Sequence, residues 1–337
     1  MSSEVKEAGM KILITGAAGF IGGFLTKHCL EANCSVLGLG VSQPIDFPGG
    51  SFELCDVRDA ARLSHFISTF QPDRIFHLAA QSYPTVSLEQ PRQTMDINAG
   101  GTINLFESVR ALAKMPTVVV ACSSAEYGPV EVANLPVREE HPLRPLHPYG
   151  VSKVAQDLLA AQYFANYQIP CVRIRIFNTT GPGKLADVCS DLARRAVEIE
   201  MGKRLPFLTV GNLTRRAIID VRDLVRGLCL AAECCVPGDV YNLGATQIYS
   251  IQTVIETIQS QLKVAFSIQE DPALVRGCDE PVIAGDVRKF QRCSGWSPEI
   301  GLVKTLQDML AWWRKQLATT PASGLPIAAS EAAEVRA

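Results

Sequence analysis

The chain has 337 residues, of which 47% are hydrophobic and 20% are charged, a balance typical of globular proteins and not of disordered ones. Its formal net charge of -2 provides no general attraction to nucleic acid or to an anionic membrane. No apolar run approaches the ~20 residues of a membrane-spanning helix. Residues 1–9 are polar and include two glutamates, unlike a secretory signal. We therefore expect a cytoplasmic protein that binds neither nucleic acid nor membrane.

The eleven cysteines follow no metal-binding or disulfide pattern. There is no Cys-x-x-Cys, and most cysteines, such as Cys29, Cys122 and Cys171, lie in apolar runs, where cysteine behaves as a small hydrophobic residue. The sequence therefore predicts reduced thiols in a cytosolic compartment and no metal site.

The first candidate site follows the apolar run 11–15, which stops at Gly16. The motif Gly16-x-x-Gly19-x-x-Gly22 then leads into a helical pattern that ends near Glu31. In this context Gly16 permits a tight turn, Gly19 lets the backbone approach a pyrophosphate, and Gly22 lets the helix pack on the strand. The helix N-terminus adds N–H donors for phosphates, so the motif predicts NAD(H) or NADP(H). The residues expected to hold the cofactor here are Gly16, Ala18, Gly19, Phe20, Ile21 and Gly22.

Nucleotide preference is read at the end of the second predicted strand, 35–39. An acidic residue there binds a ribose 2′-hydroxyl, and an arginine accepts a 2′-phosphate, but this chain has Gly40-Val41-Ser42. The Ser42 hydroxyl is able to hydrogen-bond to either group. The sequence therefore does not decide between NAD and NADP.

Further strands at 52–55, 74–78 and 117–122, with a helix over 91–114, continue the alternation of strand and helix. This alternation predicts a parallel, doubly wound sheet. The helix carries Asn98 and Gly101, which we expect to face the sheet, whereas His77, inside an apolar strand, is interpreted as a core histidine.

Small and polar residues follow the predicted strands 52–55 and 74–78, which are the third and fourth strands of the chain. Asp56 and Val57 come after the third strand, where an adenine amino group would lie. Ala79 and Ala80 follow the fourth strand and suit close approach to a flat ligand, and Ser82 lies just beyond them.

A third group of candidates lies at the end of the fifth strand and in the next helix. Apolar residues at three- and four-residue spacing after Pro148 predict a helix, on which Tyr149 and Lys153 stack one turn apart. A nearby cation lowers the pKa of a tyrosine, which would make Tyr149 a proton donor or acceptor for an alcohol or ketone. Ser123 and Ser124 end the strand, where ligands sit in open parallel sheets, so a hydroxyl there is expected to share a substrate oxygen with Tyr149.

Together these motifs resemble the extended short-chain dehydrogenase/reductase family, the NAD-dependent epimerases and dehydratases that act on nucleotide sugars. The resemblance covers roughly residues 10–316 and implies a Rossmann-type fold. It implies that Tyr149 is the acid/base, that Lys153 tunes it and holds the nicotinamide ribose, and that Ser123, or else Ser124, polarises the substrate carbonyl. The further cofactor contacts that it implies are Ser42, Asp56, Val57, Leu78, Ala79, Ala80, Ser82, Asn98, Tyr149 and Lys153.

The second half of the chain is more irregular. After a strand at 171–177, helices are predicted at 185–200, 221–233, 250–262 and 302–314. We expect a dinucleotide-binding domain over 10–178, to which about 215–245 returns, and a smaller α/β nucleotide-sugar-binding domain mainly over 179–316. The segments 1–9 and 318–337 are expected to be disordered.

Within the family, Phe177-Asn178-Thr179-Thr180-Gly181-Pro182-Gly183 is similar to the corresponding run of GDP-4-keto-6-deoxy-D-mannose reductases, with Thr179 in place of a histidine. The chain departs from that group at Arg216-Ala217-Ile218, where the group has Arg-Asp-Phe. The resemblance implies a GDP-linked 4-keto-6-deoxy sugar as substrate, with a diphosphate that suits arginine. The substrate contacts that it implies are Ser82, Ser123, Glu126, Asn178, Arg216 and Arg276.

Three reactions use this scaffold. Related dehydratases place a glutamate two residues after the serine or threonine, a position that Ala125 fills here, while Glu126 would face the other way on a regular strand. We therefore favour reduction of the C4 ketone, from GDP-4-dehydro-6-deoxy-D-mannose to GDP-D-rhamnose. A 4-epimerase, a 4,6-dehydratase and a catalytically silent nucleotide-binding protein are the alternatives. In this family helices equivalent to 91–114 and 149–167 commonly form a dimer interface, so a homodimer is expected.

Overall fold

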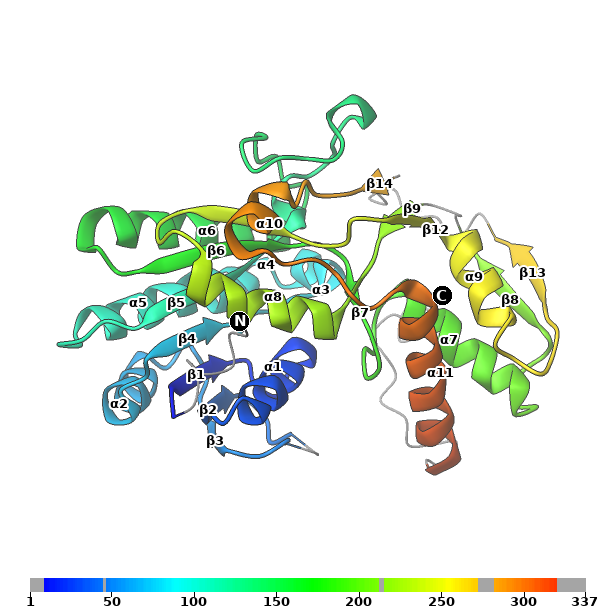
Figure 1. The fold of residues 1–337 in the computed structure, drawn as a ribbon, viewed down its shortest axis with the longest axis horizontal. Coiled ribbons are helices and arrows are strands. Elements are labelled where there is room, and N and C mark those ends of the chain that lie inside the picture. The colour runs from blue at the N-terminus through cyan, green and yellow to red at the C-terminus, as the bar shows by residue number, and fades with distance from the viewer. Residues whose placement is uncertain (1–8, 45–46, 212–214, 272–281, 320–337) are drawn as a thin grey trace. The chain divides into compact units, whose positions relative to one another are not determined.

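A computed structural model describes residues 9–44, 47–211, 215–271 and 282–319 of the chain. The chain forms two compact units. Unit 1 comprises residues 1–177, 221–246 and 283–297, and unit 2 comprises 178–220, 247–282 and 298–337. Figure 1 shows the elements of both.

Unit 1 is built on a seven-stranded sheet in which every pairing is parallel. The strand order is β11-β6-β5-β4-β1-β2-β3, so the order reverses between β1 and β4. The predicted doubly wound, Rossmann-type sheet is confirmed. Its strands are β1 (Lys11–Thr15), β2 (Ser35–Gly40), β3 (Ser51–Leu54), β4 (Arg74–His77), β5 (Thr117–Ser123), β6 (Cys171–Ile176) and β11 (Val240–Leu243).

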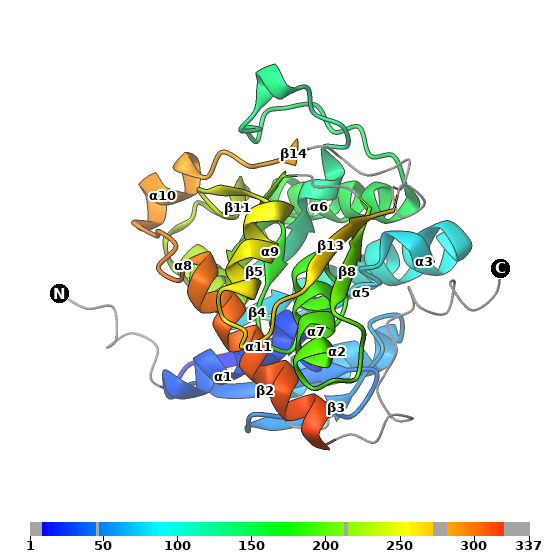
Figure 2. The ribbon, with the colours of Figure 1, turned by 90° about the vertical axis from the view of Figure 1, so that its right-hand side faces the viewer.

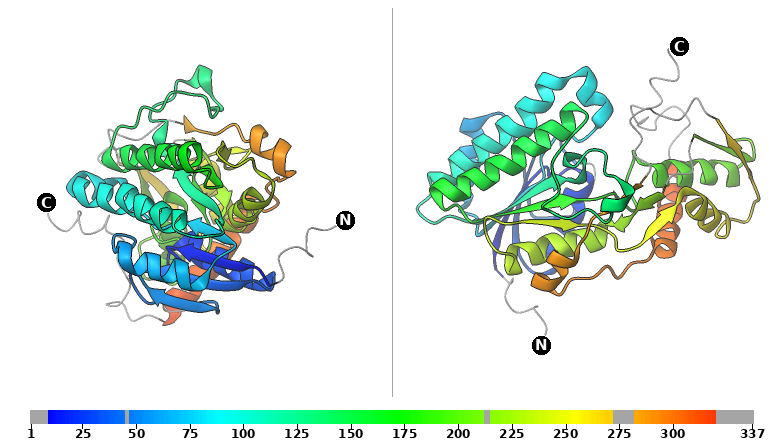
Figure 3. Two further views of the ribbon diagram at one scale, coloured as in Figure 1. Left: turned by 90° about the vertical axis from the view of Figure 1, so that its left-hand side faces the viewer. Right: turned by 90° about the horizontal axis from the view of Figure 1, so that it is seen from above.

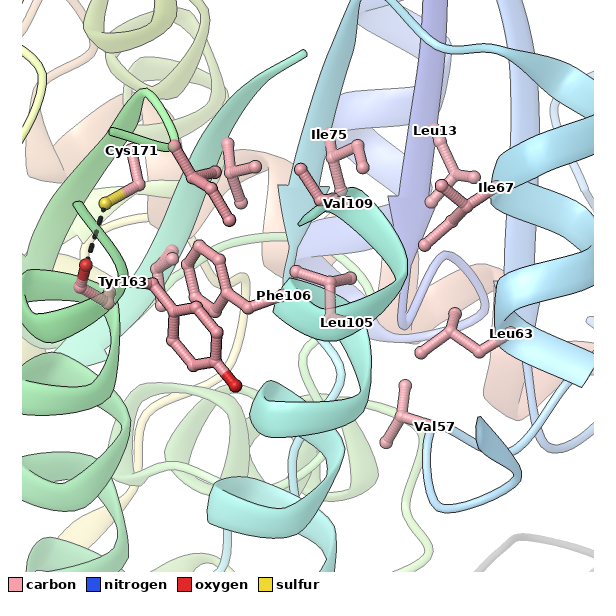
Figure 4. Close-up of a cluster of buried hydrophobic side chains, with 14 of the residues drawn as sticks. Leu13, Val57, Leu63, Ile67, Ile75, Leu105, Phe106, Val109, Tyr163 and Cys171 are labelled. Atoms are coloured by element: carbon pink, nitrogen blue, oxygen red, sulfur yellow. Dashed lines mark hydrogen bonds between the residues drawn. The ribbon is translucent and has the colours of Figure 1, made fainter. Parts of the chain in front are cut away.

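Helices cover both faces of this sheet (Figures 1 and 3). On one face, α2 (Ala60–Phe70), α5 (Gly101–Arg110) and α6 (Pro148–Tyr167) enclose the apolar core drawn in Figure 4. Alternate strand residues such as Leu13 and Ile75 point into that core. On the other face, α1 (Phe20–Glu31) and α8 (Val221–Cys234) lie side by side. Strands buried on both faces explain the continuous apolar runs that the sequence shows.

The helix predicted over 91–114 is interrupted. The chain forms α4 (Pro91–Met95), a π-helical turn η2 (Asp96–Gly100) and α5, which ends at Arg110. Asn98 lies in the π turn and is fully buried, as expected of a residue facing the sheet. A π turn bulges the backbone locally and is often found at functional sites, but it leaves no signature in apolar periodicity.

Three short helices of unit 1 were not predicted, namely α2, α3 (Pro84–Glu89) and α10 (Arg288–Ser294). The predicted C-terminal disorder is wrong for residues 318 and 319, because α11 (Leu302–Thr319) continues to Thr319 and buries Leu317. The remaining positions of that tail, and residues 1–8, lie outside the described residues.

Unit 2 has its own apolar core, formed by α7 (Val188–Glu200), α9 (Ile251–Gln259) and α11 (Figure 2). Its described strands have two to four residues each and form small separate sheets. They are β7 (Thr179–Thr180), β8 (Phe207–Val210), β9 (Arg215–Ala217), β10 (Ile219–Asp220), β12 (Ile248–Ser250) and β13 (Ser267–Glu270), while β14 (Val282–Ile283) straddles the boundary between the units.

Among the helices that the structure describes, none combines the length and apolar character needed to cross a membrane. The ten described cysteines are free thiols, and most are buried in the way that the apolar runs predicted.

His77 is a core residue, as predicted, and it links two elements. Its Nδ1 lies 2.8 Å from the Thr15 hydroxyl and its Nε2 lies 3.0 Å from the Thr102 hydroxyl. The Thr102 hydroxyl donates to the Asn98 carbonyl, so it accepts from a neutral imidazole that carries its proton on Nε2. Burial lowers the pKa of His77 to about 3. The neutral ring therefore joins the end of β1 to the start of α5.

This arrangement predicts a loss of stability in mild acid. The unfolded chain binds a proton at His77 near pH 6.5 and the folded chain does not, so the stability present above that pH falls as the pH decreases. We expect a loss of about 2 kcal/mol on going from pH 6.5 to about pH 5. Urea denaturation of the wild type and His77→Gln at both pH values measures it. The free energy of unfolding of His77→Gln should depend less steeply on pH than that of the wild type, whereas a substitution of the exposed His65 should leave the dependence unchanged. Equal changes in the free energy of unfolding between the two pH values for the wild type and both variants would contradict the role assigned to His77.

Candidate active site

The loop between β1 and α1 brings the helix close to the strand end. Gly16 has a φ of 74°, and its N–H donates to the Leu39 carbonyl at 2.8 Å. A Cβ on Gly22 would lie 2.2 Å from the Gly16 carbonyl oxygen. The turn at Gly16 and the close packing at Gly22 are therefore as the motif predicted, and each excludes a larger residue.

The N-terminus of α1 fits an anionic group. Gly19 is the N-cap residue, has no side chain to satisfy the first N–H groups, and is exposed, and the first turn has no acidic residue. Ala18, Phe20 and Ile21 are partly exposed around it. A helix end without a capping side chain carries partial positive charge and N–H donors, which is the arrangement that binds a phosphate.

The ends of β2 and β3 hold the residues predicted to contact the adenosine portion of the cofactor. Ser42 is exposed. The Asp56 carboxylate accepts from the Arg58 guanidinium at 2.6 Å and from the Arg58 N–H at 2.9 Å, and this pairing lowers the pKa of Asp56. Val57 is buried against Gly101. Asp56 thus has an ion-pair partner that the sequence analysis did not anticipate.

The loop after β4 is anchored by Asn98. Its amide oxygen accepts from the Gln81 N–H at 2.8 Å, and its amide nitrogen donates to the Gln81 carbonyl at 3.0 Å and to the Ser152 hydroxyl at 2.8 Å. The side chain is fully buried. These internal partners occupy the donors of Asn98, and its predicted contact with the cofactor stays a prediction. In the structure Asn98 fixes the loop on which Leu78, Ala79 and Ala80 are partly exposed and Ser82 is exposed.

Ser123 and Tyr149 come together at the end of β5. The Ser123 Oγ accepts from the Ala125 N–H at 3.2 Å, and its hydroxyl hydrogen-bonds to Tyr149. Burial raises the pKa of Tyr149 to about 12, although the Ser123 hydrogen bond opposes the rise. Ser124 lies one residue further on, in the short 3-10 helix η3 (Ser124–Glu126). The structure thus pairs Ser123 with the tyrosine.

Lys153 lies on α6 one turn after Tyr149 but interacts elsewhere. Its Nζ donates to the Ala121 carbonyl and to Gln156 Oε1, each at 2.7 Å, and it is 4% exposed. Burial lowers the pKa of Lys153. In the structure described, desolvation dominates the pKa of Tyr149 and keeps the phenol protonated, and the expectation that the Lys153 ammonium lowers this pKa stays a prediction.

Glu126, which was predicted to contact the substrate, is fully buried in the structure. Its Oε1 accepts from the Ser123 N–H at 2.7 Å, and its Oε2 accepts from Arg175 Nε at 3.1 Å. Arg175 Nε also donates to Asp157 Oδ2 at 2.9 Å. Neither Arg175 nor Asp157 was predicted from the sequence, although two arginines alternating in the apolar run 171–176 are a signal of buried ion pairs.

Among the described residues, the ligand-type atoms of Cys122, Glu126 and Asp157 lie within 4.8 Å of one another, a spacing that a metal ion could use. The Arg175 guanidinium already lies between the two carboxylates and supplies the compensating positive charge. Burial raises the pKa of the Cys122 thiol, which disfavours the thiolate that a metal requires.

Two of the predicted substrate contacts belong to unit 2. Asn178 precedes β7, and its buried side-chain nitrogen has no hydrogen-bond partner in the structure. Arg216 lies in β9, where its guanidinium donates to the Arg215 carbonyl at 3.1 Å. Arg276 lies outside the described residues. A buried amide donor without a partner is costly and is expected to find one in a ligand.

Comparison with known proteins shows the family of the chain and similar proteins. The family described as "GDP-mannose 4,6 dehydratase" matches residues 13–309. The chain is 28% identical to GDP-6-deoxy-D-mannose reductase of Pseudomonas aeruginosa, over 91% of this chain and 98% of that protein. It is 29% identical to UDP-glucose 4-epimerase of Streptomyces lividans, over 90% and 95% respectively. A solved structure of RMD from Pseudomonas aeruginosa complexed with NADPH superposes with a TM-score of 0.82 at 28% identity, covering 91% of this chain and 99% of that one.

The role assigned to Asn98 predicts a specific loss of stability. In Asn98→Asp a carboxylate replaces the amide donor, so the buried Ser152 hydroxyl and the partly buried Gln81 carbonyl lose the donor of their hydrogen bond. We expect the free energy of unfolding to fall by at least about 2 kcal/mol.

Chemical denaturation at neutral pH provides the measurement, and Asn104→Asp is the matched control. Asn104 lies on α5 and also donates to two carbonyls, those of Val57 and Arg58, but it is partly exposed, so water can replace its bonds. We expect a loss below about 1 kcal/mol for the control. Similar losses for the two variants would refute the anchoring role.

Proposed function

The chain belongs to the GDP-mannose 4,6 dehydratase family of NAD(P)-dependent nucleotide-sugar enzymes, and we propose that it reduces the C4 ketone of a GDP-4-keto-6-deoxy-hexose. The proposed reaction converts GDP-4-dehydro-6-deoxy-D-mannose to GDP-D-rhamnose with NADPH or NADH. The likeness to the Pseudomonas reductase supports this choice of substrate.

The observation that carries the proposal is the Tyr149 phenol, protonated and hydrogen-bonded to Ser123 at the carboxyl end of β5. Reduction of a ketone requires a proton donor for the oxygen, and the protonated phenol beside Ser123 is able to supply that proton.

The first turn of α1 and the strand ends beside it are the proposed cofactor site. The uncapped helix end at Gly19 would hold the pyrophosphate, and the partly exposed loop 78–80 would contact the nicotinamide half. The exposed Ser42 would meet the adenosine ribose or its 2′-phosphate. A reduced cofactor held there would supply the hydride for the C4 carbon.

Residues of the chain itself are proposed to bind and protonate the ketone oxygen. Ser123 is proposed to hydrogen-bond to that oxygen and stabilise the negative charge that develops on it. Tyr149 is proposed to transfer its proton to the same oxygen. Lys153 is proposed to hold the nicotinamide ribose and to lower the pKa of Tyr149 only in the loaded enzyme, since in the structure its Nζ bonds to the Ala121 carbonyl and to Gln156.

The dehydratase alternative lacks an acid in the required place. Ala125 stands where the related dehydratases carry a glutamate, and its methyl group has no proton to give. Glu126, the neighbouring acid, faces the protein interior and is held by Arg175. The 4-epimerase alternative has no such obstacle, and the likeness to a UDP-glucose 4-epimerase keeps it as the second candidate.

We assign the nucleotide sugar to unit 2. Asn178 supports this assignment because its buried amide nitrogen needs an acceptor, and a phosphate oxygen of the substrate would provide one. Arg216 is proposed to bind the diphosphate, to which a guanidinium fork is well matched.

We also propose a homodimer formed through α5 and α6, which lie side by side (Figure 3). Val151 and Leu158, seven residues apart on one face of α6, are 46% and 56% exposed, and Ile103 of α5 is 40% exposed. An apolar stripe of this kind along two adjacent helices is typical of a subunit interface.

The reaction is tested with GDP-4-keto-6-deoxymannose and NADPH or NADH, by following the loss of reduced cofactor. Tyr149→Phe removes the proton donor and keeps the ring, so we expect turnover to fall by ~10²–10⁴. Cofactor affinity, measured by fluorescence titration, should be unchanged. Normal turnover in Tyr149→Phe would remove the phenol from the mechanism. Interconversion of a nucleotide hexose without net consumption of cofactor would instead establish the epimerase.

The dimer is tested by light scattering after size exclusion. Val151→Glu with Leu158→Glu places four charges in the proposed interface of two chains, and we expect the double variant to elute at the mass of a monomer. Val132→Glu, at another exposed apolar residue of unit 1, should leave the dimer intact. A wild-type protein that elutes as a monomer would exclude the interface.

A further inference from the structure

Arg175 lies at the centre of a buried polar cluster that contacts none of the proposed ligands. It is 4% exposed. Its Nε donates to Glu126 Oε2 at 3.1 Å and to Asp157 Oδ2 at 2.9 Å. One of its terminal nitrogens donates to the Tyr127 hydroxyl at 3.0 Å and to the Glu139 carbonyl at 2.9 Å. The guanidinium thus bonds to four partners, two of which are carboxylates.

The two carboxylates belong to the two elements that carry the proposed active site. Glu126 ends η3, directly after β5 and Ser123. Asp157 lies on α6, one turn after Lys153 and two turns after Tyr149. Because Arg175 of β6 bonds to both, it ties the end of β5 to α6 at a fixed register. The separation of the Ser123 and Tyr149 hydroxyls depends on that register.

Glu126 has a second, direct link to Ser123. Its Oε1 accepts the Ser123 N–H at 2.7 Å, while its Oε2 accepts from Arg175. Each carboxylate oxygen accepts one of these two N–H groups, and a further side-chain hydrogen bond links Glu126 to Asp157, so the side chain connects the backbone of the serine to the Arg175 cluster.

We propose that Glu126 is a positioning residue, which with Arg175 and Asp157 holds Ser123 and Tyr149 at the separation that the reaction needs. The inference rests on the proposed function for the roles of these two hydroxyls. Glu126 itself contacts neither substrate nor cofactor, since its side chain is fully buried.

The charges around Glu126 explain why a carboxyl group is required there. Burial and the Asp157 carboxylate raise the pKa of Glu126, while Arg175 opposes the rise, and Lys153 and Cys122 lie nearby. Whether or not Oε2 carries a proton, it keeps a lone pair for the Arg175 N–H. An amide nitrogen has no such lone pair. In Glu126→Gln one oxygen must therefore serve two donors, and the charged guanidinium competes for it more strongly than the Ser123 N–H.

The experiment compares Glu126→Gln with Glu139→Gln. Glu139 is also a buried glutamate that accepts a backbone N–H, that of Asn242 at 2.8 Å, but it lies away from Ser123 and its carboxylate does not bond to Arg175. We expect Glu126→Gln to lower kcat by ~10–100-fold through misplacement of the serine, with KM and cofactor affinity unchanged. We expect Glu139→Gln to retain kcat within about threefold.

Amide hydrogen exchange gives a readout that needs no substrate. The Ser123 N–H should exchange faster in Glu126→Gln than in the wild type and in Glu139→Gln, because it has lost its acceptor. Should Glu126→Gln fail to fold, Arg175→Lys takes its place, since a single ammonium cannot bond to all four partners of the guanidinium; the same loss of kcat is expected.

Several results would overturn the inference: unchanged kcat in Glu126→Gln, an equal loss in Glu139→Gln, or unchanged exchange at Ser123. The failure of the proposed function is distinct from these. A wild type that turns over no nucleotide sugar would refute the proposed reaction, and faster Ser123 exchange in Glu126→Gln would still establish that Glu126 positions the serine.

Discussion

The candidate site depends on the register between strand β5 and helix α6, because Ser123 ends the strand and Tyr149 begins the helix. Apolar packing alone specifies such a register weakly, since one apolar contact can replace another at little cost. Buried ionic hydrogen bonds are different, because a small displacement leaves charges unpaired in a medium of low dielectric constant. The Arg175 guanidinium, shared between Glu126 and Asp157, therefore fixes the position of α6 on the sheet. Its cost in desolvation is offset by hydrogen bonds to four partners, with the single Nε–H shared between the two carboxylates.

A second polar chain secures the other side of the site. The His77 ring joins Thr15 of β1 to Thr102 of α5, and Asn98, one turn before Thr102, binds both the Gln81 backbone and Ser152 of α6. Asn98 lies in the π turn η2, where the backbone departs locally from α-helical geometry. Two independent networks thus hold α6, and the Tyr149 phenol is presented from a rigid element.

The sequence predicted the sheet well and the electrostatics of the site poorly, for a physical reason. Strand positions and the turns at Gly16 and Gly22 follow from apolar runs and from the space that a Cβ would need, and both properties are local. Lys153, Asn98 and Glu126 each bond to at least one residue that is distant in the chain, namely Ala121, Ser152 and Arg175 respectively, so their hydrogen bonds and pKa values depend on tertiary packing. Lys153 illustrates the difference, because helical spacing places it beside Tyr149, yet its Nζ reaches across to the Ala121 carbonyl of β5.

The inward direction of Glu126 also bears on how one scaffold supports different reactions. In η3 the side chains of Ala125 and Glu126 face different surroundings, the first partly exposed and the second fully buried. An acid at the first position would lie on the side of the proposed substrate, and an acid at the second position is held inside by Arg175. A one-residue shift of a glutamate along this turn would therefore exchange a proton donor for a structural support. The choice between dehydration and simple proton transfer at C4 would then depend on whether the carboxyl group stands at position 125 or at position 126.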